Sequence, residues 1–151
     1  MYDSTIDAKL HIEKIQDLLM TIAVPELTQR AYDHDKSKLM DPEKETYDKY
    51  IPMLKKVKYG TPEYNSIKEE MAKYGLSHHY SVNRHHPEHF ENGIKDMTLF
   101  DITEMFFDWY AASLRSDTGF EKGLLMNKER YNISDELYNI LINTYNEYMK
   151  K

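Results

Sequence analysis

Histidine is concentrated in one short segment of this chain. Residues 78 to 90 read HHYSVNRHHPEHF and hold five of the seven histidines in 151 residues. Imidazole groups bind transition metals, transfer protons near neutral pH and hydrogen-bond to phosphate. Because the chain has no cysteine, imidazole and carboxylate groups must hold any metal. The residue types therefore predict metal or acid–base chemistry at this segment.

Three further positions carry the same residue types on segments with helical periodicity. His11 shares a stripe with apolar residues and is expected to face the core. His34 and Asp35 adjoin at the expected end of the second helix, where two neighbouring side chains have room to reach one ion. Asp108 lies on the most apolar helix, where a buried carboxylate needs a cation or strong donors. Each position alone also fits a structural role, as a hydrogen-bonded core histidine, a helix cap or part of a solvated acidic face.

Helical periodicity covers most of the chain, and strand-like alternation is hard to find. Apolar residues recur at helical spacing over about 5–22, and Pro25 predicts a break before a second helix. Further helix starts are predicted at Asp41–Pro42, Thr61–Pro62, Thr98 with Asp101, and Ser134. Roughly 20 residues, 76–97, lack a long periodic pattern, and loops of that length in compact domains are usually functional or disordered. We predict an all-α fold in one domain.

Composition narrows the functional classes. The 20 basic and 26 acidic side chains leave a net charge of −6 without a long run of like charge, so stable nucleic-acid binding is not expected. The first residues contain acids and lysines throughout, and no apolar run approaches the roughly 20 residues that a membrane span needs. We expect a soluble cytoplasmic protein with no membrane partner.

The order histidine, His-Asp doublet, aspartate on three helices resembles the HD-domain superfamily of metal-dependent phosphohydrolases. HDKSK is similar to that superfamily's His-Asp-x-x-Lys pattern, with Lys38 as the lysine. HHPEHFENG is similar to the His-His-Glu region of its cyclic-dinucleotide phosphodiesterase branch, although Pro87 separates His86 from Glu88, Asn92 replaces an aspartate and the branch's Gly-Tyr-Pro is absent. The wider pattern, most of the chain from His34 onward, is similar to an uncharacterised phage and bacterial family grouped with HD proteins.

The resemblance implies a single compact HD-like bundle of about six or seven helices across residues 1–151. It implies that the metal ligands are His11, His34, Asp35 and Asp108. By analogy with binuclear HD enzymes, a second metal or a phosphate would be bound within the set His79, His85, His86 and His89, of which His85, His86 and His89 are favoured and His79 has a supporting role.

Charged residues near these positions are candidates for substrate contacts and proton transfer. Arg84 could clamp a phosphate with two hydrogen bonds and Lys38 with a point charge, although each could equally be an ordinary surface cation. Glu88 and Glu104 are candidates for general acid–base catalysis or for orienting metal ligands.

The function that the resemblance implies is hydrolysis of a nucleotide, either a mononucleotide or a small signalling nucleotide. One or two divalent ions (Mn, Co, Ni, Fe or Zn, with Mg also open) would polarise a water that attacks phosphorus. The alternatives are a non-catalytic HD scaffold that binds a nucleotide or protein around a structural metal, and a di-iron oxygenase. A small-molecule nucleotide is the expected partner, a homo-oligomer is left open, and the expected location is a bacterial or phage-infected cytoplasm.

Overall fold

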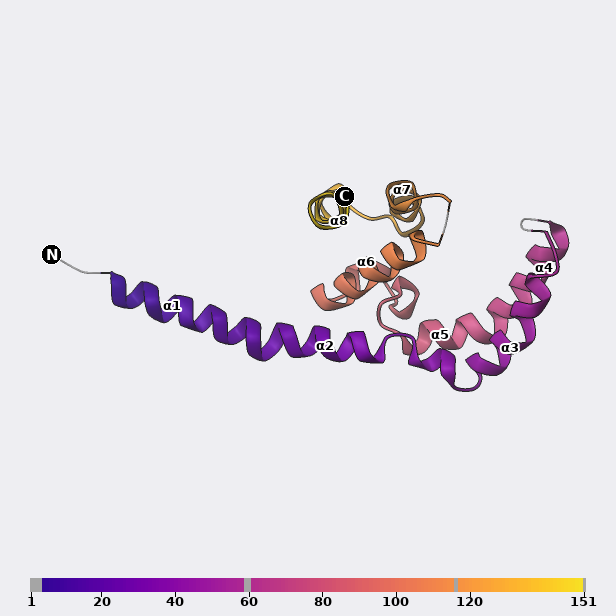
Figure 1. Cartoon of the computed structure of the whole chain (residues 1–151), viewed down its shortest axis with the longest axis horizontal. Helices are drawn as coiled ribbons and strands as arrows, with labels where there is room; N and C mark the ends of the chain where they lie inside the picture. The colour runs from indigo at the N-terminus through magenta and orange to yellow at the C-terminus, as the bar shows by residue number, and fades with distance from the viewer. Residues whose placement is uncertain (1–3, 59–60, 116, 151) are drawn as a thin grey trace. The chain divides into compact units, whose positions relative to one another are not determined.

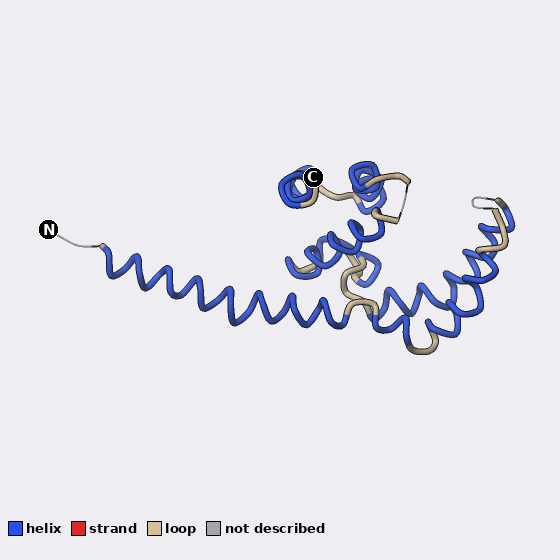
Figure 2. Tube along the Cα trace, in the orientation of Figure 1, coloured by secondary structure: helices blue, strands red, loops and turns tan. Residues whose placement is uncertain are grey.

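The computed structural model of the chain describes residues 4–58, 61–115 and 117–150. Figure 2 shows helices joined by loops and turns, and the described residues contain no strand. The prediction of an all-α fold is confirmed. The chain divides into two compact units, Met1–His34 and Asp35–Lys151. The prediction of one HD-like domain across residues 1–151 stays a prediction.

Residues 5–33 of the N-terminal unit form one continuous helix. Helix α1 (Thr5–Leu18) continues through a π-helical turn, η1 (Leu19–Ala23), into α2 (Val24–Asp33), which Figure 1 shows in indigo to purple. The predicted break at Pro25 does not occur. A π turn widens the helix directly before the proline, and Pro25 lies in the first turn of α2, where a missing N–H is tolerated.

Residues 4–34 of the N-terminal unit remain accessible. None of residues 4–34 is buried, and the His11 side chain is exposed. The prediction that His11 faces a core is therefore not borne out. The apolar stripe on which that prediction was based is real, but α1 and α2 run end to end, so within the described residues 4–34 no helix packs against it.

The second unit begins with a helical hairpin. Helix α3 (Glu43–Leu54) packs against α4 (Pro62–Met71) and the π turn η3 (Ala72–Leu76) that follows it. Thr61 caps α4 as predicted, because its hydroxyl accepts from the Tyr64 N–H at 3.2 Å. A Cβ at Gly75 would lie 2.8 Å from Thr46 Cγ2, so glycine lets the two arms approach closely. This contact fixes where the chain leaves the hairpin toward the histidine segment.

The histidine segment is folded into short helical pieces rather than an extended loop. Helix α5 (Ser77–Val82) continues directly from η3, and two 3-10 turns follow, η4 (Pro87–His89) and η5 (Gly93–Asp96). Pro87 begins a turn as predicted, because its fixed φ suits a first helical position. The bend between α5 and η4 brings the rings of His85 and His86 close to that of His79, with centroids 6.0 and 4.7 Å away.

The last three helices build the hydrophobic core of the second unit. Helix α6 (Leu99–Ser113), with the predicted Thr98–Asp101 capping box, packs with α7 (Phe120–Tyr131), and α7 packs with α8 (Asp135–Tyr148). The buried cluster at their centre consists of Phe106, Phe120, Leu124 and Leu141. Each such side chain contributes roughly 1.5–3 kcal/mol by burial. Among the described residues, none of the helices is both long and apolar enough for a membrane span.

Candidate metal centre

Asp35 opens the second unit in an unusual backbone conformation. Its φ is +58°, in the left-handed region that aspartate tolerates better than most residues, and it precedes the 3-10 turn η2 (Lys36–Leu39). Lys38 Nζ donates to Asp35 Oδ2. The other oxygen, Oδ1, lies 3.3 Å from His79 Nε2 and 3.5 Å from His85 Nε2. The carboxylate therefore faces a cation on one side and two imidazoles on the other.

Three imidazoles converge on the same point as Asp35. His79 comes from α5, and His85 and His86 come from the bend before η4. The Nε2 atoms of His79 and His86 lie 2.8 Å apart, and one donor atom from each of the four residues lies within 4.8 Å of all the others. Donors about 2.0–2.2 Å from a shared ion are separated by roughly 3–4 Å. The four donors thus have the spacing of a ligand set.

Carboxylates hold two of these imidazoles from behind. Glu43 Oε2 lies 2.9 Å from His79 Nδ1, and Glu104 Oε1 lies 3.1 Å from His85 Nδ1. An Nδ1–H that donates to a carboxylate leaves Nε2 as the lone-pair nitrogen, and this arrangement orients most metal-bound histidines in proteins. His79 and His85 are 1% and 2% exposed, so these contacts are shielded from water. For both rings, a carboxylate at Nδ1 favours the tautomer whose Nε2 lone pair can bind metal.

Hydrogen bonds also tie the two ligand segments together. The Asn83 amide donates to Ser37 Oγ at 2.8 Å and to the His79 backbone carbonyl at 2.9 Å. Ser37 belongs to η2, directly after Asp35, whereas Asn83 follows α5. These bonds therefore hold the carboxylate segment against the histidine segment.

Burial favours the neutral form of the histidines. Burial, together with the charges of His85 and His79, lowers the pKa of His86 to about 3. Burial and the charge of Lys38 lower the pKa of His79 as well. For Glu43 burial acts in the other direction, but hydrogen bonds involving His78, Ser37 and His79 outweigh it and lower the pKa of the Glu43 carboxyl. These shifts keep His79 and His86 neutral near neutral pH, which is the form of imidazole that binds metal.

Several residues predicted from the sequence lie at this centre. Asp35, His79, His85 and His86 form it, and Glu104 orients His85. An oxygen of Asp108 lies within 4.8 Å of an oxygen of Asp35, which places a second carboxylate beside the first. The sequence favours His85, His86 and His89 and gives His79 a supporting role, whereas in the structure His79 Nε2 is among the converging donors.

Other predicted residues have partners elsewhere. His89 Nδ1 donates to the Tyr80 carbonyl at 3.0 Å, and His89 belongs to none of the groups of close donor atoms among the described residues. The guanidinium of Arg84 donates twice to Asp101, at 3.1 and 3.0 Å. Neither side chain is directed to the centre by these bonds.

Glu88 likewise has its own partners. Its Oε1 accepts from Arg130 Nη2 at 2.8 Å and from Tyr131 Oη at 2.9 Å. His11 lies exposed on α1, and His34 is the last, half-buried residue of the N-terminal unit, next to Asp35 in the chain. Their assignment as ligands stays a prediction from the sequence.

Glu43 is the residue beside the candidate centre that sequence reasoning missed. It is fully buried, and its two oxygens bond to neighbouring rings, Oε1 to His78 Nδ1 at 2.8 Å and Oε2 to His79 Nδ1 at 2.9 Å. In the sequence it is an acid in the first turn of a helix, an ordinary position for a glutamate. Only the contact between η3 and α3 brings the Glu43 carboxylate under α5.

The described geometry could hold one metal ion on three imidazoles and a carboxylate, and comparison with known proteins adds a family without a known activity. No curated protein and no solved structure matches the chain. One family model matches residues 2–147, nearly the whole length. The chain therefore belongs to DUF5662, a family of unknown function.

Proposed function

We propose that Asp35, His79, His85 and His86 bind a divalent transition metal and that the protein hydrolyses a phosphate ester of a nucleotide. The proposal is carried by the close approach of His79 and His85 Nε2 to Asp35 Oδ1, with His86 Nε2 2.8 Å from His79 Nε2. Carboxylates lie behind His79 and His85. Imidazole with carboxylate is a donor set for Mn, Fe, Co, Ni or Zn. The phosphate-ester part is supported by the resemblance of His34–Asp35 with Lys38 to the HD-domain superfamily.

Residues of the chain provide the remaining chemistry. When bound, a divalent metal supplies the Lewis acidity that makes water a nucleophile at neutral pH. The carboxylate of Asp108, beside Asp35, would accept the proton that the attacking water loses as its oxygen bonds to phosphorus and the ester oxygen leaves. Lys38 Nζ, on a side chain that is 39% exposed, would contact a phosphate oxygen while keeping its bond to Asp35.

A structural metal site is the second candidate function. If the bound ion is zinc, four protein donors favour a structural site over a catalytic one. Four protein ligands saturate a tetrahedral zinc, and closed sites of this kind are structural. Six-coordinate Mn, Fe, Co or Ni would keep two positions for water and substrate on the same four ligands. The identity of the ion therefore separates a catalytic centre from a structural one.

The test begins with the metal content of protein purified without a histidine tag. We expect about one ion per chain by mass spectrometry, with the ion lost in Asp35→Asn and His79→Gln. The matched control is Asp48→Asn, which changes an exposed carboxylate on α3 that pairs with Lys44. If wild-type protein binds no ion at micromolar concentration, the metal centre itself is refuted.

Activity is then tested on metal-loaded protein. Phosphate release is measured from nucleoside mono-, di- and triphosphates and from cyclic nucleotides with each ion in turn. We expect release by wild type and Asp48→Asn, and none by Asp35→Asn or Asp108→Asn. Metal binding without release from any nucleotide would leave the structural metal. Release that persisted in both Asp35→Asn and Asp108→Asn would refute the assignment of the site.

A further inference from the structure

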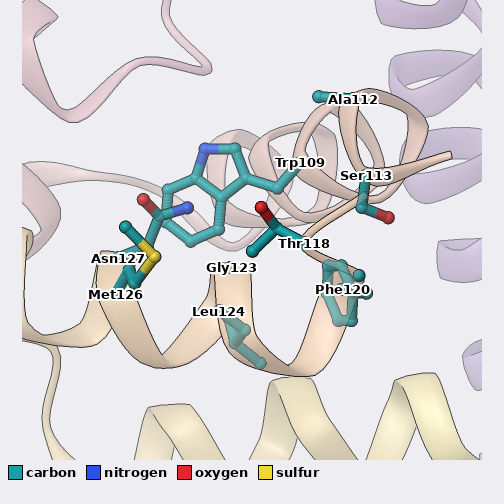
Figure 3. A pocket seen from close by; sticks show the side chains of 10 residues that line it. Trp109, Ala112, Ser113, Thr118, Phe120, Gly123, Leu124, Met126 and Asn127 are labelled. Carbon is teal, nitrogen blue, oxygen red and sulfur yellow. The ribbon is translucent and has the colours of Figure 1, made fainter. Parts of the chain in front are cut away.

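A cavity of about 270 Å³ lies between α6 and α7, apart from the four metal-binding residues. Figure 3 shows its walls, with Trp109 and Ser113 from α6, Gly123 and Asn127 from α7, and Thr118 from the turn between the helices. The volume is slightly below the roughly 300–1,000 Å³ of pockets for drug-sized ligands. It suits a single ring system rather than a peptide or a complete cofactor.

Trp109 provides a rigid aromatic wall. Its ring stacks on Tyr131 with an interplanar angle of 10° and centroids 5.7 Å apart. Tyr131 is held in turn by its hydrogen bond to Glu88, and its pKa is raised by burial and by that bond. Trp109 also lines the cavity, so a flat ring bound there would lie against the indole.

Gly123 keeps the floor of the cavity open. It lies in the interior of α7, where glycine is roughly 1 kcal/mol less favourable than alanine. A Cβ at this position would have no atom within 4 Å, so packing does not explain the glycine. Gly123 also lacks the positive φ that distinguishes Gly119 at the start of the same helix. The absence of a side chain at Gly123 leaves space beside Trp109.

Polar groups border the same space. Asn127 lies one helical turn after Gly123, on the same face of α7, and its amide offers a donor and an acceptor side by side. That pair matches the donor and acceptor pattern on the edge of a nucleobase. Ser113 and Thr118 also line the cavity, although the Ser113 hydroxyl donates to the Tyr110 carbonyl at 2.7 Å.

We propose that this cavity binds a planar heteroaromatic ring of the nucleobase class, stacked on Trp109 and hydrogen-bonded by Asn127. Stacking on an aromatic side chain contributes to the binding of any base, so a free nucleoside should bind weakly but measurably. The site does not depend on the metal centre, since none of the four metal-binding residues lines the cavity. Asp108 and Trp109 are nonetheless consecutive on α6, so one helix would serve both a phosphate and a base.

The test uses Trp109 as its own reporter, because it is the only tryptophan in the chain. The full chain, with excess chelator to remove metal, is titrated with adenosine, guanosine, cytidine and uridine. Fluorescence is excited at the red edge of the indole band, and calorimetry checks the affinities. We expect saturable quenching by at least one nucleoside and none by ribose. Quenching by no nucleoside would overturn the proposal, as would equal binding of an aliphatic acid such as decanoate.

Variants on α7 locate the binding site. Gly123→Leu fills the cavity and is expected to weaken nucleoside binding at least about tenfold, because the stacked position is lost. The matched control Lys122→Leu adds the same side chain one residue earlier, at an exposed position outside the cavity, and should bind like wild type. Wild-type affinity in Gly123→Leu would refute the location.

Gly123→Ala guards against a folding defect. Alanine favours the helix and meets no neighbour within 4 Å, so this variant should melt at a higher temperature than wild type and still bind the nucleoside more weakly. Unchanged or tighter binding in Gly123→Ala would count against the proposal. The nucleoside titrations need neither bound metal nor phosphate release. A failure of the proposed metal-dependent hydrolysis would therefore not change their outcome, and each proposal can be refuted without the other.

Discussion

Glu43→Gln removes one charge from behind the metal centre without changing the size of the side chain. Glu43 is fully buried and bonds to His78 and His79 with separate oxygens, at 2.8 and 2.9 Å. A glutamine can accept from one ring only and presents an NH₂ group to the other. Removing a carboxylate that orients a ligand typically weakens metal affinity 10- to 100-fold, or about 1.4–2.7 kcal/mol.

The assay is a competition titration against a fluorescent chelator at fixed pH. Wild type, Glu43→Gln and the control Glu45→Gln are compared with the same ion. Glu45 is exposed in the same first turn of α3, so its substitution changes the net charge equally without touching a histidine. Circular dichroism and a thermal melt confirm that each variant is folded. We expect the affinity to fall in Glu43→Gln alone.

Two results would refute this reasoning. If folded Glu43→Gln bound metal within about twofold of wild type, well below the 10- to 100-fold range, the Glu43–His79 pair would not be orienting a ligand. If Glu45→Gln weakened binding as much as Glu43→Gln, the effect would come from net charge rather than from the buried contact.

Three further predictions use unfolding measurements. Asp35→Asn should leave metal-free protein folded with a cooperative urea transition, since asparagine tolerates the positive φ, yet lose metal affinity in the titration above. His86 has a folded pKa of about 3 and an unfolded value near 6.5, so only the unfolded chain takes up its proton between these values. The unfolding free energy of metal-free protein should therefore fall as pH is lowered through this window. The fall should be less than about 1 kcal/mol per pH unit, because the ring is partly exposed. Urea midpoints measured against pH should fall less steeply in His86→Asn than in wild type. Asp101→Ala removes both the capping box and the acceptor of Arg84, and urea unfolding should show a loss of about 2–4 kcal/mol. A loss below about 1 kcal/mol, the value of a cap alone, would mean that the ion pair adds nothing.

Local signals in the sequence were enough to predict much of the fold. Helical periodicity and the caps at Thr61, Thr98 and Ser134 predicted helices where α4, α6 and α8 begin, because a cap depends on residues within one turn. The break at Pro25 was wrong because a proline in a first turn is compatible with a continuing helix. The helical pieces within residues 76–97 were not predicted, since segments this short have too few residues to show a period.

The sequence was enough to predict which residue types form the candidate centre, but not every residue that belongs to it. The doublet at Asp35 and the histidine-rich segment indicated imidazole and carboxylate ligands. The contact between Glu43 and His79 joins positions 36 apart in the sequence, and no local pattern encodes it. The central place of His79 depends on the continuation of η3 into α5, which the sequence alone did not distinguish from a loop.

The four candidate ligands lie on either side of the α3–α4 hairpin in the sequence. Asp35 precedes the α3–α4 hairpin, and His79, His85 and His86 follow it. An ion held by both ends would close the intervening residues into a ring, as a cross-link does. Restricting the unfolded chain in this way stabilises a protein by on the order of 3–5 kcal/mol for loops of several tens of residues. A chelating buffer would then open the ring, and the melting temperature and protease resistance of the hairpin would follow the free metal concentration.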